Sequence, residues 1–316
     1  MMYKNSIRIL FSNFNLVWKV MLYTLITLAV IGGLAYVSAV PVFNVLANNG
    51  FFNLIKDVFE GFVTNLNLLE FIKGLGEIST SFFEIIINNF SNIWVSIVLF
   101  IFIVVFLERF LIGQTKLSSA YCLYASMSNN MKIGIFSSYF SNFSKVVLFE
   151  LVKFITTFPI DIFIGYVIIQ CFKLFSLGTA MAILTPFIIV LVIVILMSLK
   201  ISLFSCWMPM ISVKNDGIFK CLKNNFKLIN RRFFKIFANS IGIVLTIIMI
   251  NGFALIFTLG AGLIITIPLS MVLETTFQMS AYYGSYGMRY YVDNNTIVEP
   301  KKMEATEKLK RTKYFI

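Results

Sequence analysis

Six stretches of the chain are long and apolar enough to cross a lipid bilayer. A span needs roughly 20 mostly apolar residues, because the hydrocarbon core is about 30 Å thick and a helix rises about 1.5 Å per residue. The composition agrees, since 59% of the 316 residues are hydrophobic, 13% are charged and none is histidine. The pattern predicts an all-α, polytopic membrane bundle of three helical hairpins. Its spans are expected near residues 20–40, 87–107, 146–172, 176–199, 236–258 and 262–283, within one transmembrane domain formed by residues 1–292.

The longest apolar run, residues 236–273, has 38 residues without a charge and is too long for one crossing. Glycines at 260 and 262 predict a tight turn that divides it into two spans. The fourth apolar run resumes after Lys200, and residues 200–213 are read either as an extension in the membrane interface or as a re-entrant segment. The first run could instead be a secretory signal, but its 21 uncharged residues exceed the roughly 7 to 15 of a signal core.

The distribution of Lys and Arg predicts the orientation, because loops rich in these residues stay cytoplasmic. With the N-terminus inside, 23 of the 26 Lys and Arg lie on the inner side, and only Lys56, Lys73 and Lys173 lie outside. Both termini are therefore expected in the cytoplasm, including a charged tail at 293–316. Abundant Asn, Lys, Ile and Phe are typical of a protein encoded by an AT-rich genome, which favours a bacterial source. In a bacterium, the predicted spans would lie in the cytoplasmic membrane.

A short repeat precedes two of the spans. Residues 11–27 and 140–156 match at eight of their positions, beginning with Phe-Ser-Asn-Phe in both. Asn225-Phe226 repeats part of this motif before the fifth span. The match suggests three related units, each an amphipathic cytoplasmic segment followed by a hairpin, although chance matches among such abundant residues are the alternative.

Two segments outside the spans are amphipathic. Residues 218–237 place apolar side chains at helical spacing with lysines and arginines on other faces, which is typical of a basic helix at a membrane surface. Residues 48–84 form an outer loop with apolar residues at i, i+3, i+4 and i+7 and an excess of acids. We expect two membrane-surface helices there, broken at Gly74 and Gly76, with a gating lid as the alternative.

The last third of the chain resembles a broad group of uncharacterised six-pass bacterial membrane proteins. These are related in style to the membrane portion of some glycerophosphodiester phosphodiesterases. The resemblance lies in Asp216-Gly217-Ile218-Phe219 and Lys223-Asn224-Asn225-Phe226 before a hairpin, and in the tyrosine-rich exit at 281–286. The soluble phosphodiesterase domain of that family has no counterpart here, so the resemblance implies a six-pass membrane fold and no catalytic residue.

Ionisable residues inside the predicted spans are the candidate functional site, because a charge at a helix centre costs about 2.5–3.5 kcal/mol. Glu274 lies deep in the sixth span, with Ser270, Thr275 and Gln278 within about a turn. Asp161 follows Pro159 in a polar stretch that we expect to be broken, as in transporter sites. Glu150 and Lys153 are three residues apart and can pair. The candidate polar site comprises Glu274, Asp161, Gln278, Glu150 and Lys153, with a structural or interfacial role as the alternative for each.

No catalytic motif is present, and without histidine the commonest general base is missing. Four cysteines show no Cys-x-x-Cys spacing and are expected to be reduced packing residues, so we expect no metal site and no cofactor. The net charge of +12 suits anionic lipid headgroups, at about 1 kcal/mol per basic residue, and no nucleic-acid partner is expected. A non-enzymatic protein that organises lipids or protein partners is the first hypothesis. A transport component with a site near Asp161 and Glu274 is the second, and a lipid-modifying enzyme is the third.

Overall fold

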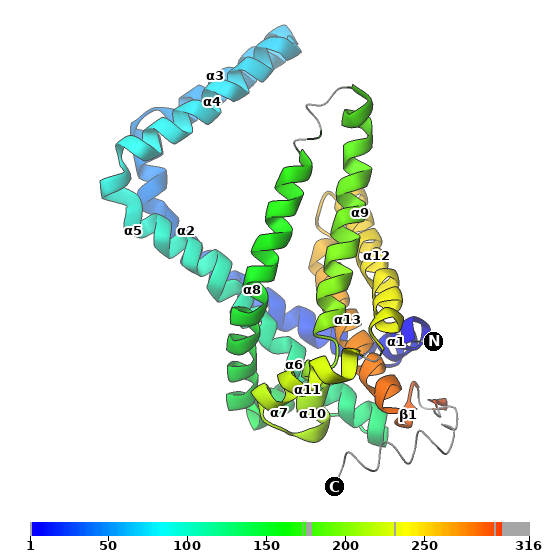
Figure 1. Cartoon of the computed structure of the whole chain (residues 1–316). Helices are drawn as coiled ribbons and strands as arrows, with labels where there is room; N and C mark the ends of the chain where they lie inside the picture. Colours follow the sequence, from blue (N-terminus) through cyan, green and yellow to red (C-terminus); the bar gives the residue numbers. More distant parts are fainter. Residues whose placement is uncertain (1, 173, 175–178, 231, 294, 299–316) are drawn as a thin grey trace. The chain divides into compact units, whose positions relative to one another are not determined.

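A computed structural model describes residues 2–172, 174, 179–230, 232–293 and 295–298. The described chain is almost entirely helical, and six helices in it are long and apolar enough to cross a membrane, as the sequence predicts. The predicted start of the fourth span at 176 and the tail from 299 onward lie outside the described residues. Figure 1 shows the elements along the chain.

The first half of the chain contains eight of these elements. They are α1 (Met2–Ser12), α2 (Phe14–Asn48), α3 (Phe51–Asn65), α4 (Leu68–Asn88), α5 (Phe90–Ile101), the π-helical turn η1 (Phe102–Leu107), α6 (Glu108–Asn129) and α7 (Ile135–Ser141). The segments α5, η1 and α6 follow one another without a break and form one candidate span, Phe90–Asn129. This helix is longer than a bilayer requires, so part of it extends beyond the hydrocarbon.

The second half contains α8 (Phe143–Phe172), α9 (Thr179–Leu203), α10 (Trp207–Lys214), α11 (Ile218–Asn230), α12 (Phe233–Phe257) and α13 (Leu263–Tyr286). Two short strands, β1 (Tyr290–Tyr291) and β2 (Ile297–Val298), pair antiparallel after α13. The predicted turn between the fifth and sixth spans is confirmed, because α12 ends and α13 begins on either side of residues 258–262. Gly260 has a φ of 91°, a conformation that glycine adopts without steric cost.

The chain divides into two compact units, one of residues 1–25 with 113–316 and one of residues 26–112. In the first unit, the core lies where α1, α6, α10, α11 and the second half of α13 meet. Its largest fully buried side chains include Trp207, Phe277, Tyr282 and Leu123. By contrast, the apolar residues of the spans remain largely exposed, as expected of surfaces that contact lipid.

Residues 200–213 do not form a simple continuation of α9. The helix ends at Leu203, and α10 follows as a separate short helix with buried side chains from Trp207 to Ser212. The indole of Trp207 donates a hydrogen bond to the Ile218 carbonyl at 3.0 Å. Segment 200–213 therefore enters the protein core and holds the start of α11.

The two Phe-Ser-Asn-Phe motifs adopt the same local structure. The asparagines, Asn13 and Asn142, each separate a short helix from a long one, and each side chain donates to the carbonyl four residues earlier, at 2.9 and 3.1 Å. The third copy differs, because Asn225 lies inside α11 and accepts from the Cys206 backbone N–H at 3.0 Å. The helix α11 ends at Asn230, five residues after this asparagine, and α12 begins at Phe233.

The helix α1 packs on α12 and α13. The Tyr3 hydroxyl lies 2.9 Å from that of Thr246, and Asn5 donates to the Tyr290 hydroxyl at 2.7 Å. Arg8 forms an ion pair with Asp293 at 2.8 Å. Hydrogen bonds from Thr296, the Asn295 backbone and Arg8 lower the pKa of Asp293, so this contact is complete at neutral pH and weakens as the carboxyl is protonated in acid.

The second unit contains the outer segment, and the expected break at Gly74 and Gly76 is wrong. The chain turns at Leu66 and Asn67, where Leu66 takes a left-handed conformation and its N–H bonds the Phe62 carbonyl at 2.8 Å. Both glycines lie inside α4. A Cβ atom at Gly74 would come within 2.7 Å of a Val58 methyl, so glycine is required there by the close approach of α3 rather than by a turn.

This contact predicts different effects at two glycines of one helix. Gly74→Val should destabilise the packing of α3 on α4 by about 1–3 kcal/mol, because the new side chain overlaps Val58. Gly76→Val is the matched control, since no heavy atom lies within 4 Å of a Cβ at that position. Limited proteolysis at residues 66–67 should accelerate for the first variant only. Equal cleavage rates for the two variants would contradict the close approach.

Candidate functional site

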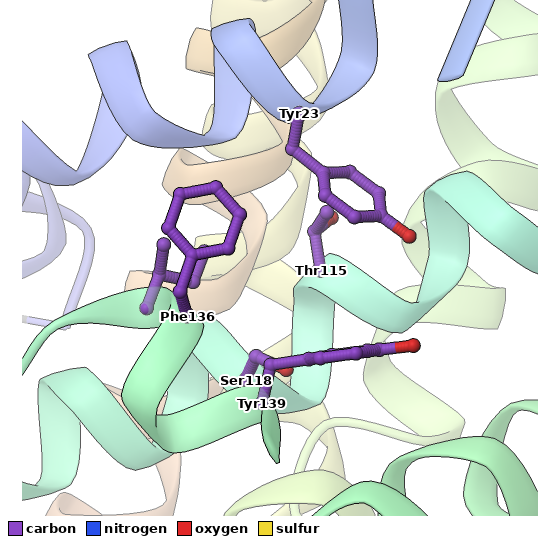
Figure 2. A pocket seen from close by; sticks show the side chains of 6 residues that line it. Tyr23, Thr115, Ser118, Phe136 and Tyr139 are labelled. Carbon is purple, nitrogen blue, oxygen red and sulfur yellow. The ribbon is translucent and has the colours of Figure 1, made fainter. Parts of the chain in front are cut away.

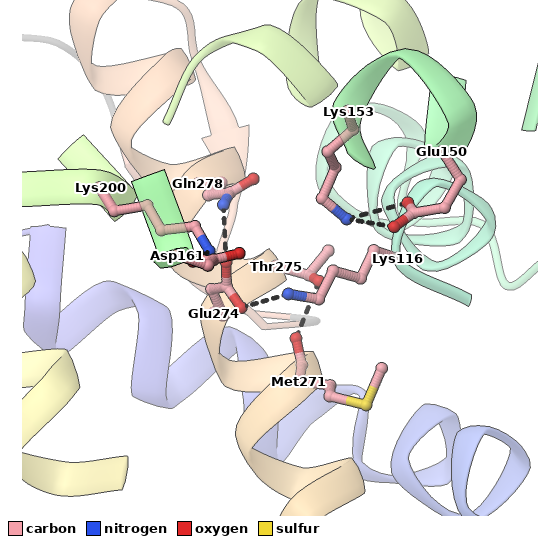
Figure 3. Close-up of polar contacts among 9 residues, drawn as sticks. All are labelled: Lys116, Glu150, Lys153, Asp161, Lys200, Met271, Glu274, Thr275 and Gln278. Atoms are coloured by element: carbon pink, nitrogen blue, oxygen red, sulfur yellow. Dashed lines mark hydrogen bonds and ion pairs between the residues drawn. The ribbon is translucent and has the colours of Figure 1, made fainter. Parts of the chain in front are cut away.

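Charged residues from four helices meet within the first unit. Lys116 lies on α6, Glu150, Lys153 and Asp161 on α8, Lys200 on α9, and Glu274 with Gln278 on α13. Glu274 is near the middle of its helix, and all six charges fall within candidate spans. Figure 3 shows these side chains together, directed into the region between the helices.

Glu274 is held by two partners. The Lys116 ammonium lies 2.5 Å from its Oε2, and the Gln278 amide donates to its Oε1 at 3.1 Å. Lys116 and Glu274 are each 21% exposed. Of the polar neighbours expected from the sequence, only Gln278 binds the carboxylate. Ser270 instead bonds Asn251 of α12, at 2.9 Å, and Thr275 donates to the Met271 carbonyl.

The predicted pair of Glu150 and Lys153 is confirmed. The ammonium lies 2.9 Å from both carboxylate oxygens, and the Glu150 side chain is only 3% exposed. The carboxylate also packs directly on α6, where a Cβ at Gly113 would come within 2.0 Å of its Oε1. Gly113 thus provides the space that lets a charged group lie between two helices.

Asp161 pairs with Lys200, which joins α8 to α9. The expected break near Pro159 is wrong, because α8 runs without interruption from Phe143 to Phe172. A proline removes one N–H donor, and the surrounding turns of α8 keep their own hydrogen bonds. The hydroxyl of Thr156 donates to the Val152 carbonyl at 2.7 Å, which satisfies its donor within α8.

The three pairs form one electrostatic group. Figure 3 shows the Lys116–Glu274, Lys153–Glu150 and Lys200–Asp161 pairs together in one region of the first unit. We call this group the charge cluster. It contains three ammonium groups and three carboxylates, so it is neutral as a whole.

Two members of the charge cluster were missed by sequence reasoning. The sequence places Lys116 beyond the predicted second span and Lys200 at the end of the fourth, both on the inner side, whereas the structure places them on α6 and α9 in contact with Glu274 and Asp161. The signal available in the sequence was charge balance, since three acids within the spans require three cations if the site is to be neutral. Spacing alone could not identify which lysines supply them.

The charge cluster is poorly suited to catalysis. Lysine and carboxylate pairs can hold or transfer a proton, but each carboxylate here contacts an ammonium group. Among the described residues, no group of three His, Cys, Asp or Glu is placed to hold a metal ion. The contacts favour electrostatic bridges between helices.

A second polar region lies between α2, α6 and α7. Figure 2 shows a hollow lined by Tyr23, Thr115, Ser118, Ile135, Phe136 and Tyr139. Its free space is about 10 Å³, about enough for one water molecule. At this volume the hollow is too small for a substrate. The Tyr139 hydroxyl donates to the Gln114 side chain at 2.7 Å, and burial raises the pKa of this phenol.

The four cysteines are free, as predicted, and three are buried. Burial and the neighbouring Asp216 carboxylate raise the pKa of Cys221 to about 11. The Cys221 thiol is therefore protonated at neutral pH, and Cys221 is a packing residue rather than a nucleophile.

The fold and the charge cluster together define a helical protein with six candidate membrane spans and paired charges inside them. Comparisons with protein-family models, with characterised proteins and with solved structures found no match. The resemblance to six-pass bacterial membrane proteins remains a prediction that residues 216–226 and 281–286 carry.

The pairing predicts a double-mutant cycle. Glu274→Gln or Lys116→Gln should each lower stability by about 1–3 kcal/mol, because each leaves a partly buried charge without its partner. The double variant should recover most of this loss. The apparent Tm of purified protein in lipid, followed by size exclusion after heating, measures the effect.

The matched control is the exposed pair Lys56 and Glu60, whose side chains are both more than half exposed. Removing either charge should change stability by less than about 0.5 kcal/mol. Additive losses at Glu274 and Lys116 would show that these two residues do not interact in the membrane.

Proposed function

We propose that the protein is a non-enzymatic polytopic protein of the bacterial cytoplasmic membrane that organises anionic lipids, and through them protein partners, at its inner face. In this proposal both termini are cytoplasmic and the spans form three hairpins. The short helices α1, α7 and α11 are then amphipathic elements at the inner surface.

One observation carries the proposal: the two Phe-Ser-Asn-Phe breaks each expose their aromatic residues. Phe11 and Phe140 are 67% and 72% exposed, and Phe14 and Phe143 follow directly on the next helix. Two candidate spans separate the breaks, so both lie on the same side of the membrane. Aromatic rings at the level of the headgroups are typical anchors in the interface.

Basic residues accompany these aromatic residues. On α11 the buried side chains Ile218, Cys221, Asn225 and Ile229 share one face and pack on the protein. The exposed ones include Lys220, Lys223 and Lys227, with Phe219 and Phe226 beside them. Exposed lysines next to aromatic rings match the chemistry of an anionic headgroup above an acyl chain.

The charge cluster is compatible with this role. Its carboxylates contact lysines, so the charges hold helices together without a bound substrate. The absence of a catalytic motif in the sequence also favours a protein that binds rather than transforms lipids.

The proposal predicts selective enrichment of anionic lipid. The triple variant Lys220→Gln, Lys223→Gln and Lys227→Gln should retain less phosphatidylglycerol when purified from mixed vesicles, by up to about fivefold per lysine. Lipid extracted from the purified protein, analysed by mass spectrometry, measures the retained fraction.

The control variant, Lys56→Gln with Lys73→Gln, removes charge from the outer segment and should leave this enrichment unchanged. The enrichment should also fall as salt is raised, since exposed charges are screened. Equal lipid composition for both variants and the parent protein would overturn the proposal.

Transport is the second candidate, and the partial exposure of the charge cluster favours it. Lys200 and Asp161 are 21% and 24% exposed, similar to Lys116 and Glu274. Charges in a span that face lipid are costly, so water or a solute beside them would be favourable.

Chemical modification separates the two functions. If the cluster lines an aqueous path, a water-soluble carbodiimide should modify Glu274 in sealed vesicles, with the exposed Glu60 as the positive control. Modification of Glu60 alone would support the structural role of the cluster and count against transport.

A further inference from the structure

The α3–α4 hairpin has two chemically different sides. The helices pack together through Phe62 and Phe71, whose ring centroids are 4.4 Å apart, and through Val58 against Gly74. Apart from this seam, both helices are largely exposed. Each exposed side of the hairpin must therefore contact water, lipid or another protein surface.

One side of the hairpin is acidic. A hollow between the two helices is lined by charged residues of both, including Asp57, Glu70, Lys73 and Glu77. Because α3 and α4 contribute to the same hollow, their polar faces point in the same direction. Across the outer segment five acids outnumber two lysines, which suits contact with water.

The opposite side is apolar. Phe52, Phe59 and Val63 recur on α3 at i, i+7 and i+11, which places them on one face, and Leu66 follows directly after the helix. On α4, Ile72, Leu75, Phe82 and Phe83 share a face in the same way. Since the polar faces share one side, these two apolar faces share the other. All eight side chains are exposed, and Val63 and Leu66 are 73% and 77% exposed.

The apolar side is continuous with the membrane-spanning surface of the same unit. At the junction of α2 and α3 the chain bends at Gly50, whose φ is 71°, and Figure 1 shows the hairpin turning away from α2 and α5. The rings of Phe43 on α2 and Phe52 on α3 lie 6.4 Å apart across this bend. Phe43 is itself exposed, so the apolar surface of the span runs onto the hairpin without a polar gap between these rings.

We propose that the apolar side of the α3–α4 hairpin lies on the lipid leaflet opposite the one that contacts α1, with its acidic side turned to water. The first span separates α1 from the hairpin, so the two lie on opposite sides of the membrane. Lys56 is the charged residue that shares the apolar face of α3, since it lies four residues after Phe52 and three before Phe59. Its long side chain can reach the level of the headgroups while its methylene groups stay beside the apolar residues, so the contact depends mainly on apolar burial. This inference goes beyond the proposed inner-face function and stands or falls independently of it.

Site-directed spin labels test both sides of the hairpin. Val63→Cys and Phe83→Cys place labels on the apolar side, and Asp57→Cys and Glu77→Cys place matched labels on the polar faces, since Asp57 and Glu77 line the charged hollow. Cys171→Ala removes the one native thiol that is not buried. Accessibility to oxygen and to a water-soluble nickel chelate is measured in vesicles of phosphatidylcholine alone.

The apolar-side labels should show a ratio of oxygen to nickel accessibility at least severalfold above that of the polar-face labels. The difference should persist when half of the lipid is phosphatidylglycerol. Leu66→Cys and Ile72→Cys supply independent positions if either apolar variant fails to fold.

Two results would overturn the proposal. High nickel accessibility on both sides would show that the hairpin projects into water. Spin–spin broadening at position 63 that disappears on dilution with unlabelled protein would show that a second copy of the chain covers the apolar side. A change in lipid enrichment at the inner face would bear only on the proposed function.

Discussion

The cost of placing a charge in hydrocarbon constrains this structure more than any other interaction. A lone lysine or carboxylate at the centre of a span costs about 2.5–3.5 kcal/mol, so six such groups are tolerated only in combination. The structure pairs four of them between helices, Lys116 of α6 with Glu274 of α13 and Lys200 of α9 with Asp161 of α8, and it pairs Glu150 with Lys153 inside α8. The two interhelical bridges favour these helix pairs, because purely apolar surfaces in lipid have little preference for one another.

The cost of a charge in hydrocarbon also explains why a glycine, Gly113, lies beside the charge cluster. Glu150 lies between α6 and α8 only because Gly113 leaves room for its carboxylate. In the second unit, Gly74 allows α3 to approach α4 in the same manner, there with an apolar partner. Close approach compensates for the weak attraction between helices in lipid, since van der Waals contact increases as backbones come together.

Much of the fold could be predicted from the sequence because hydropathy and span length act locally. The six spans and the turn at residues 258–262 follow from uncharged runs and glycines. The local pair of Glu150 and Lys153 could be predicted from its spacing, but the partners of Glu274 and Asp161 could not, since Lys116 and Lys200 are distant from them in sequence and lie at or beyond the ends of the predicted spans. Gly74 and Gly76 suggested a break for the same reason, because a glycine that permits packing and a glycine that ends a helix look alike in sequence. Asn225 repeats the Asn-Phe pair of Asn13 and Asn142 but fixes the turn before α10 instead.

The docking of α1 has a consequence for synthesis of the chain. The partners of Tyr3 and Arg8 lie 236 to 288 residues further along, in α12 and beyond α13. At about 5–20 residues per second, a ribosome needs roughly 12 to 58 s to make the intervening chain. The helix α1 is therefore made well before the residues on which it docks. During that interval its apolar face is available to the membrane surface or to a chaperone.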